Sequence, residues 1–264
     1  MMYAQRFIAA GALVGALVFS MAVSAIDVQE VKTRDGVTAY LAQDDSNPII
    51  AFSFEFRGGS SIDPADKLGL SAMAAGLLDE GAGDLDSFAF QSTLQDKAIR
   101  LSFSANTDSF SGSVTTIKAN ADEAFRLMAL ALSAPRFDEE PVERIRRQIL
   151  VSLARSAENP GRIARDTMFA EIFPDHPYGR PSNGTPETIQ SITADDLASY
   201  TAQRFAKDRL IVGVAGDITP RQLRRRLDEV FVHLPDAIDT EWRVPDTAVT
   251  YVGTVVVDKA VPQS

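Results

Sequence analysis

The chain contains no cysteine and only two histidines, His176 and His233, among its 264 residues. The absence of cysteine excludes disulfide bonds, thiolate zinc sites and a cysteine nucleophile. The fold must therefore be stabilised by its hydrophobic core, which a chain of this length with 45% hydrophobic residues can form. The shortage of histidine also removes the commonest metal ligand from almost the whole chain.

Positive charge is also in short supply. The chain has 26 lysines and arginines against 36 aspartates and glutamates, which gives a formal net charge of -10. Such a balance argues against a general nucleic-acid-binding surface, so we expect no nucleic-acid partner. Two basic clusters, at residues 144–147 and 221–226, lie on predicted helices and are interpreted as solvated helix faces.

The first 25 residues have the pattern of a secretory signal peptide. Arg6 supplies a positive charge, residues 7–21 form an almost unbroken run of apolar and small residues, and Val23-Ser24-Ala25 has the small residues of a cleavage site. Such a segment would direct export and be cleaved before Ile26, and a periplasm is the expected compartment. The alternative is an uncleaved membrane anchor, although the apolar run is marginal for spanning a bilayer. Membrane contact is expected only through this segment.

Segments rich in β-branched, aromatic or alternating residues predict a sheet. They are Val28–Thr33, Val37–Gln43, Ile49–Arg57, Ile99–Ser104, Ser109–Ile117 and Leu210–Ala215. Helical patterns are predicted over Asp66–Glu80, Ser87–Leu94, Ala121–Ser133, Glu139–Ala157, Pro160–Phe173, from Thr193, and over Thr219–Phe231. Strands followed by helices, with one strand returning, indicate an α+β fold in which helices pack on an antiparallel-rich sheet.

The predicted helix Asp66–Glu80 has two different faces. Its core-facing stripe consists of Leu70, Met73, Ala74 and Leu77. The other face carries only small residues, Ala72, Ala75 and Gly76. Glycine in the middle of a helix costs about 1 kcal/mol relative to alanine. Gly81 is the expected C-terminal stop of this helix.

A polar, linker-like stretch at residues 235–250 separates the main body from a further strand predicted at Tyr251–Lys259. We therefore divide the chain into a signal peptide at 1–25, one domain at 26–234, the linker at 235–250, and the start of a truncated second domain at 251–264.

Four motifs follow one another along the chain. They are residues 57–64, Gly69-Leu70-Ser71-Ala72-Met73-Ala74-Ala75-Gly76, His176-Pro177-Tyr178-Gly179-Arg180-Pro181 and residues 210–217. In this order they resemble motifs of the M16 peptidases (insulinase, pitrilysin, mitochondrial processing peptidase), and the resemblance covers residues 28–232. The segment at residues 69–76 is similar to the family's Gly-Leu-Ala-His-Phe-Leu-Glu-His, an inverted zinc-binding helix. The resemblance implies the fold of an M16 metallopeptidase-like N-terminal domain.

The resemblance also implies where the catalytic groups of active relatives would lie. The two histidine positions fall on Ala72 and Gly76, the glutamate general base falls on Ala75, and the third ligand falls near Val151 or Ser152. Zinc needs lone-pair donors, and a base must take the proton of the metal-bound water. None of these five residues is a histidine or a carboxylate. We therefore expect no catalytic residue, no metal ligand and no cofactor in this chain, and zinc only in active relatives or a partner subunit.

Two other chemistries are disfavoured. Ser60, Ser61 and Ser71 have no histidine nearby in sequence and no nucleophile elbow, which argues against serine hydrolysis. The acidic residues between Asp79 and Asp86 lack the spacing of a calcium loop and are interpreted as a solvated turn.

In M16 proteins the substrate adds as a strand at the sheet edge near the zinc helix. The matching segment is about Arg100–Ser104, with Ser102 and Phe103 as the candidates nearest the cleft. Main-chain hydrogen bonds supply most of the affinity of such binding, so varied peptides can be accepted. The alternative is an ordinary covered strand.

Two-subunit M16 enzymes pair a zinc-bearing chain with a partner that lacks the motif, and together they enclose peptides in a chamber. The resemblance thus implies a catalytically inactive subunit of a heterodimer that takes part in proteolysis, and the signal-like N-terminus implies that this subunit is exported. Its partners would be a zinc-bearing M16 subunit and peptide substrates. Two alternatives stay open: an active zinc metalloendopeptidase with non-standard ligands, and an exported peptide-binding module that acts without a partner.

Overall fold

The computed structural model describes residues 27–239 and 243–259. The expected signal peptide and residues 260–264 of the expected second domain lie outside the described residues, so the division into domains stays a prediction. Within the described ranges, none of the helices combines the length and the apolar composition needed to cross a membrane.

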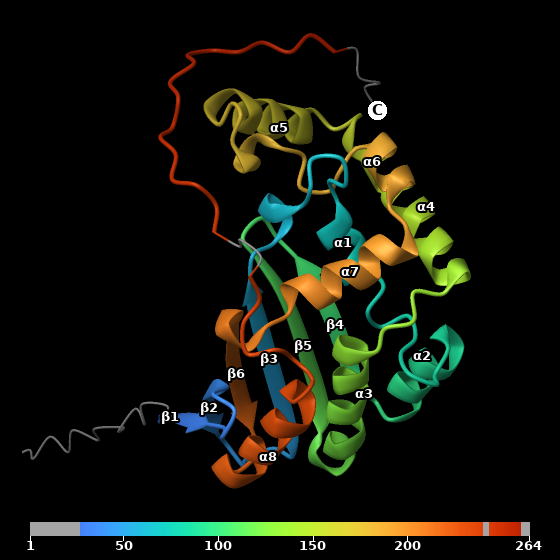
Figure 1. Cartoon of the computed structure of the whole chain (residues 1–264), viewed down its shortest axis with the longest axis vertical. Helices are drawn as coiled ribbons and strands as arrows, with labels where there is room; N and C mark the ends of the chain where they lie inside the picture. The colour runs from blue at the N-terminus through green and yellow to red at the C-terminus, as the bar shows by residue number, and fades with distance from the viewer. Residues whose placement is uncertain (1–26, 240–242, 260–264) are drawn as a thin grey trace, which may run out of the picture.

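A six-stranded sheet forms the centre of the fold, in the order β1-β2-β6-β3-β5-β4 (Figure 1). Its strands are β1 (Val28–Lys32), β2 (Thr38–Gln43), β3 (Ile49–Arg57), β4 (Arg100–Ala105), β5 (Ser109–Ile117) and β6 (Leu210–Gly216). All neighbouring strands are antiparallel except β2 and β6, which are parallel. The predicted antiparallel-rich sheet is confirmed.

The α-helices of the described part are α1 (Leu70–Ala75), α2 (Ser87–Asp96), α3 (Ala121–Ser133), α4 (Glu139–Ser156), α5 (Pro160–Ile172), α6 (Pro186–Ser191), α7 (Ala194–Arg204) and α8 (Pro220–Phe231). Short 3₁₀ helices are η1 (Ser60–Ile62), η2 (Lys118–Asn120), η3 (Pro177–Gly179) and η4 (Lys207–Arg209). Every predicted helix is present, and α6 is additional. It begins inside a turn-rich loop, where Thr185 caps the helix and Pro186 occupies its first turn.

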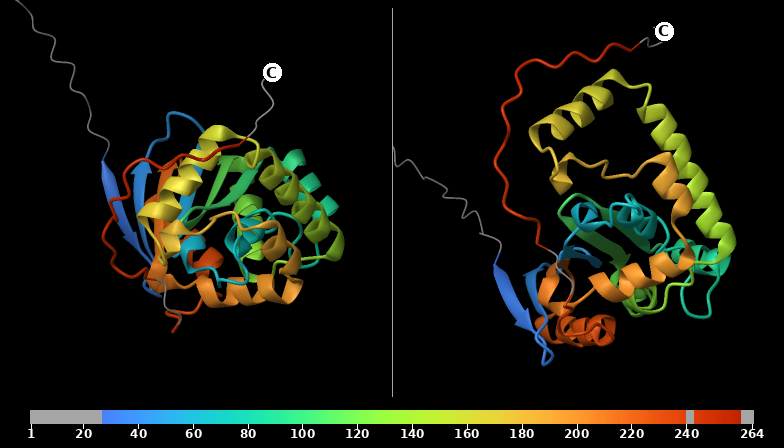
Figure 2. Two further views of the ribbon diagram at one scale, coloured as in Figure 1. Left: turned by 90° about the horizontal axis from the view of Figure 1, so that it is seen from above. Right: turned by 45° about the horizontal axis from the view of Figure 1, so that its top comes forward.

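The sheet has one packed face and one open face, as β3 shows most clearly. Its residues alternate strictly between exposed and buried, and the buried set consists of Ile50, Phe52, Phe54 and Phe56. The helices lie on one side of the sheet (Figure 2). Phe52 meets Phe125 of α3 edge to face at a centroid distance of 5.4 Å, and Phe56 stacks on Phe205 at 4.7 Å. Aromatic side chains of β3 therefore join the sheet to the helical layer.

The helix α1 is much shorter than the predicted Asp66–Glu80, so that prediction was wrong at both ends. Before the helix, Gly69 adopts a φ of 90°, a left-handed conformation that glycine tolerates without strain. After it, Gly76 is the C-cap, and Leu77 N–H donates to the Ala74 carbonyl only three residues back, at 3.1 Å. Gly76 lies at the helix end, so the expected mid-helix cost does not arise. The predicted core stripe Leu70, Met73, Ala74 and Leu77 is buried, as expected.

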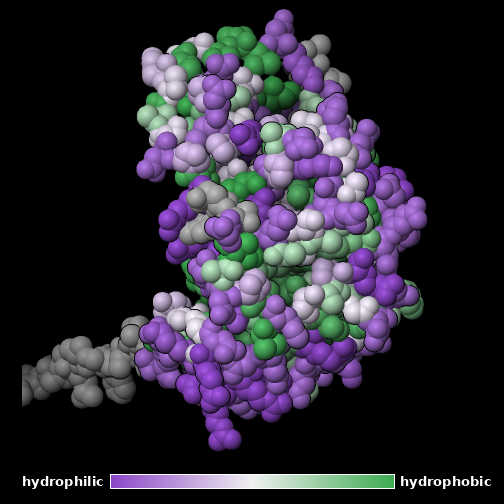
Figure 3. Space-filling view, viewed as in Figure 1, coloured by the Kyte–Doolittle hydropathy of each residue, from purple (hydrophilic) through white to green (hydrophobic). Residues whose placement is uncertain are grey.

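At the far end of the molecule, α4 leads to α5, which stands away from the sheet (Figure 1). No residue of α5 is buried, and Met168 is 48% exposed. Figure 3 shows hydrophobic residues gathered at this end. The C-terminal segment runs past α5: Thr250 N–H donates to the Ile172 carbonyl at 3.0 Å, and Val255 and Val257 line a cavity of about 340 Å³ with α5.

The strand predicted at Tyr251–Lys259 is not formed. A strand requires a hydrogen-bonded neighbour, and none of the described strands pairs with this segment. The run of valines suits a strand by composition alone. In the structure these side chains lie along α5, and Val256 is 85% exposed.

Candidate functional site

The site that corresponds to a zinc centre would lie on α1, which packs against β4, α4 and α7. Ala72 and Gly76, four residues apart on one face, are partly exposed, and Ala75 is buried. Two methyl groups and a hydrogen therefore stand where two imidazoles and a carboxylate would be needed. The residues present do not fit a zinc ion, and no hydrolytic step through a metal can be derived from them.

The space next to Gly76 is filled from the neighbouring helix α4. A Cβ atom built on Gly76 would lie 3.1 Å from Cγ2 of Ile145, which is itself buried. This is closer than ordinary van der Waals contact, so a larger side chain at Gly76 requires Ile145 to move. The apolar spacing Ile145, Ile149 and Leu153 on the predicted long helix would have indicated which face of α4 turns inward.

Val151, the candidate for the third ligand position, does not join α1. It is 51% exposed, whereas Ile149, Leu150 and Leu153 pack against the core. Ser152 is also exposed. The inward face of α4 is therefore apolar. Residues two apart on a helix do not share a face, and Val151 is two positions from both Ile149 and Leu153, so it points away from this face.

The two histidines do not replace the missing ligands. His176 is buried; its Nδ1 accepts from Tyr178 N–H at 3.2 Å, and its Nε2 lies 2.9 Å from the Pro245 carbonyl, to which it donates. His233 is exposed. Nowhere in residues 27–239 and 243–259 do three histidine, aspartate or glutamate side chains gather closely enough to hold a metal ion.

A buried polar cluster under the start of α1 was not found from the sequence. Asp63 is 2% exposed and accepts from the Ser71 N–H at 3.1 Å and from the Ser71 hydroxyl at 2.5 Å. Burial raises the pKa of Asp63 to about 6, although the Ser71 bonds and the charge of Arg204 oppose the rise. Arg204 and Tyr200 come from α7, and Arg204 donates to the Ile62 carbonyl at 2.5 Å. No sequence pattern links these residues, because the chain brings them together only on folding.

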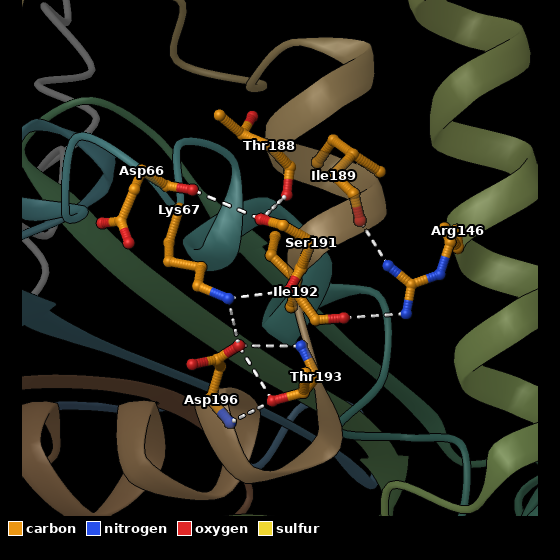
Figure 4. Close-up of polar contacts among 9 residues, drawn as sticks. All are labelled: Asp66, Lys67, Arg146, Thr188, Ile189, Ser191, Ile192, Thr193 and Asp196. Carbon is orange, nitrogen blue, oxygen red and sulfur yellow. Dashed lines mark hydrogen bonds and ion pairs between the residues drawn. The ribbon is translucent and has the colours of Figure 1, made fainter.

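Polar contacts also fix the chain just before α1 (Figure 4). Lys67 donates to the Ser191 carbonyl at 2.6 Å and to the Asp196 carboxylate at 2.8 Å. Burial alone would raise the pKa of Asp196, but its bonds to Lys67 and Thr193 outweigh burial and lower the pKa. Asp196 therefore stays ionised, and its bond to Lys67 holds the segment that precedes α1 against the N-terminus of α7.

Arg146 holds α4 in place from the other side (Figure 4). Its guanidinium donates to the carbonyl of Ile189 and, at 2.8 Å, to the carbonyl of Ile192 at the end of α6. A forked guanidinium can satisfy two such carbonyls at once, which an ammonium group does less well. Arg146 and Ile145 together place α4 against the rest of the site.

We expect Arg146→Met to lower the free energy of unfolding by about 2 kcal/mol, because two part-buried carbonyls lose charged donors while the aliphatic stem is kept. Urea denaturation would measure the change. The matched control is Arg147→Met, an exposed neighbour on the same helix, for which a change of less than about 0.5 kcal/mol is expected. Equal effects of the two substitutions would disprove the anchoring role of Arg146.

Ser102 and Phe103 lie on β4, the last strand of the sheet, and β5 is its one pairing partner among the described strands. At the hairpin, Asn106 N–H donates to the Ser109 carbonyl at 2.9 Å. Backbone groups alternate in direction along an antiparallel strand, so Leu101, Phe103 and Ala105 direct theirs to the free edge. Ser102 is exposed, with its hydroxyl 3.0 Å from that of Ser113. The structure thus places the candidate strand at a sheet edge that no described strand occupies.

Comparison with known proteins gives the relatives of this fold. No family model matches the chain. It is similar to the non-peptidase homolog YmxG of Helicobacter pylori, with 29% identity over 215 residues that span 80% of this chain and 49% of that protein. It is 27% identical over 161 residues to a probable mitochondrial-processing peptidase subunit beta of Schizosaccharomyces pombe, covering 57% of this chain and 35% of that protein.

Among solved structures, the peptidase M16 inactive domain from Pseudomonas fluorescens matches with a TM-score of 0.78 at 22% identity, covering 84% of this chain and 54% of that chain. The chain spans about half the length, or less, of these proteins. By its sequence relatives and by its fold, the chain is an M16 peptidase homologue whose α1 lacks the zinc ligands.

Proposed function

We propose that the chain is a catalytically inactive M16 subunit that pairs with a zinc-bearing M16 peptidase and helps to enclose its peptide substrates. The observation that carries the proposal is the combination of a donor-free α1 with a free β4 edge beside it. Without metal ligands on α1, the chain has no means to activate water. The free edge of β4 can still pair with the backbone of an extended peptide. The signal-like N-terminus supports a periplasmic location, where such a pair would act on exported peptides.

The test is zinc content and peptide cleavage, measured first on the chain alone. We expect far less than one zinc per chain by elemental analysis and no cleavage of a fluorogenic peptide. Mixing with a zinc-bearing M16 protein from the same source should give chelator-sensitive cleavage above that of the partner alone. The control is the same partner with its catalytic glutamate replaced, which should form the complex without cleaving.

Two results would contradict this proposal. Zinc near one equivalent together with cleavage by the chain alone would instead establish an active metalloendopeptidase with non-standard ligands. A failure to bind or stimulate any zinc-bearing M16 protein of the source would remove the partner role.

The free β4 edge also favours a second candidate, a peptide-binding module that needs no partner. If this candidate function is right, the isolated chain should bind extended peptides as tightly as its complex with a zinc-bearing subunit does. N-methylation of alternate peptide amides should abolish the binding, because it removes the main-chain donors.

A further inference from the structure

A groove beside the free edge of β4 has a chemical character of its own. It runs between α2 and the start of β4 and has a volume of about 430 Å³. Its apolar lining includes Leu94, Ile99 and Leu101, and none of its lining residues is acidic. The groove is continuous with the edge on which an added strand would lie, because Leu101 belongs to both.

Phe88 forms an unusual wall of this groove. It lies in the first turn of α2 and is 82% exposed, while Phe90 two residues on is fully buried in the core. The position of the turn is fixed, because the Asp86 side chain accepts from Ala89 N–H at 2.8 Å. An exposed phenyl ring on a capped helix turn offers a large apolar contact to a side chain that enters the groove.

Arg100 supplies a charge at the same place. It is the first residue of β4, is exposed, and among the described residues no carboxylate forms an ion pair with it. Most other basic side chains around the α1 site are paired, such as Arg144 with Glu80 at 2.6 Å. An exposed guanidinium at a sheet edge, at the rim of a groove whose lining has no acidic residue, is complementary to an anionic side chain on a bound strand.

The geometry of strand addition decides which peptide side chains meet these groups. Directly opposite residues of paired strands project on the same face. The peptide residue opposite Leu101 therefore projects to the helix side, into the groove beside Phe88. Its neighbour, opposite Arg100, projects to the open side with the guanidinium.

We propose that the groove and Arg100 at its rim together select the peptide: a bulky apolar residue opposite Leu101 enters the groove, and an acidic residue opposite Arg100 flanks it. Phe88 and Arg100 are then the specificity-determining residues of the β4 edge. The inference rests on the proposed function, because it requires peptides to add to this edge.

The experiment measures binding of short labelled peptides to the full chain by fluorescence anisotropy. The probe is Thr-Ser-Glu-Leu-Glu-Ser-Thr, in which an acidic residue flanks the leucine whichever way the peptide runs. We expect the versions with Glu-Ala-Glu or Lys-Leu-Lys at the centre to bind about tenfold more weakly. Phe88→Ala should remove the preference for leucine over alanine, and Arg100→Glu should reverse the preference for glutamate over lysine.

Matched controls separate these effects from general changes in surface or charge. Phe169→Ala removes a partly exposed phenylalanine of α5, and Arg147→Glu makes the same charge change on α4; both should leave the peptide preferences unaltered. If all three peptides bind wild type equally, or if Phe88→Ala and Arg100→Glu behave like their controls, the selectivity is refuted while peptide binding stands. If no peptide binds wild type, peptide addition to the edge fails as well, and the inference falls with it.

Discussion

Replacing Gly59 with alanine is expected to lower the free energy of unfolding by about 3 kcal/mol or more, or to prevent folding. A Cβ atom at this position would lie 2.0 Å from the Asn106 carbonyl oxygen and 2.7 Å from the Ser109 nitrogen. These are backbone atoms, which cannot swing aside as the end of a flexible side chain can.

The clash matters because backbone bonds join the same two segments. Gly58, Ser60 and Ser61 donate to the carbonyls of residues 108, 106 and 107 at 2.7, 2.8 and 2.9 Å. The segment that precedes α1 is thus bonded to the β4–β5 hairpin, and separation of the two would break several bonds together. An alanine at Gly59 should therefore disturb the site as well as the stability.

The control is Gly213→Ala on the open face of β6, where an added Cβ meets nothing within 4 Å. Removing backbone freedom from the unfolded chain should leave this variant neutral or slightly more stable. Urea unfolding of both variants, followed by circular dichroism, provides the comparison. A Gly59→Ala protein as stable as wild type would show that the two segments are not held as closely as the structure indicates.

Asp63→Asn is expected to flatten the dependence of stability on pH. Burial raises the folded-state pKa of Asp63 from 3.8 to about 6, so the folded protein binds a proton that the unfolded chain releases. The stability contributed by the protonated group is complete below about pH 3.8 and is lost as the pH rises to about 6. Between about pH 4.5 and about pH 7.5, wild type should lose about 2 kcal/mol relative to Asp63→Asn.

Chemical denaturation at several pH values measures this difference. Asp45→Asn, which changes an exposed aspartate, is the control and should run parallel to wild type. Some pH dependence should remain in Asp63→Asn, because burial and the nearby Glu80 also raise the pKa of Asp79 to about 6. Parallel curves for Asp63→Asn and wild type would mean that Asp63 is not desolvated by folding.

The sheet could be predicted from the sequence because its signals are local. Strict alternation in β3 and glycine or asparagine-rich turns between strands place the strand ends within one residue. The sequence alone also shows that Ala72, Ala75 and Gly76 carry no donor atom for a metal, because this depends on residue type. Their correspondence to the positions of a zinc site stays a prediction.

The remaining errors have tertiary causes. The length of α1 depends on Gly69, which has a left-handed conformation, and on Asp63. Asp63 lies outside the helix, and its carboxylate accepts a hydrogen bond from the Ser71 N–H. The predicted strand at 251–259 has the right composition but no pairing neighbour among the described strands. The burial of Ile145 beside Gly76 depends on the approach of a helix that lies far away in the chain. A single sequence carries no local signal for such approaches.

The contact between Ile145 and Gly76 bears on any attempt to build a metal site into α1. A histidine introduced at Gly76 would have its Cβ atom 3.1 Å from Cγ2 of Ile145, so the Ile145 side chain would have to shift. A further ligand from α4 would need a donor on a helix face that is apolar. Installing a zinc centre in this chain would therefore demand coordinated changes on two helices, and histidines at Ala72 and Gly76 alone would not be enough.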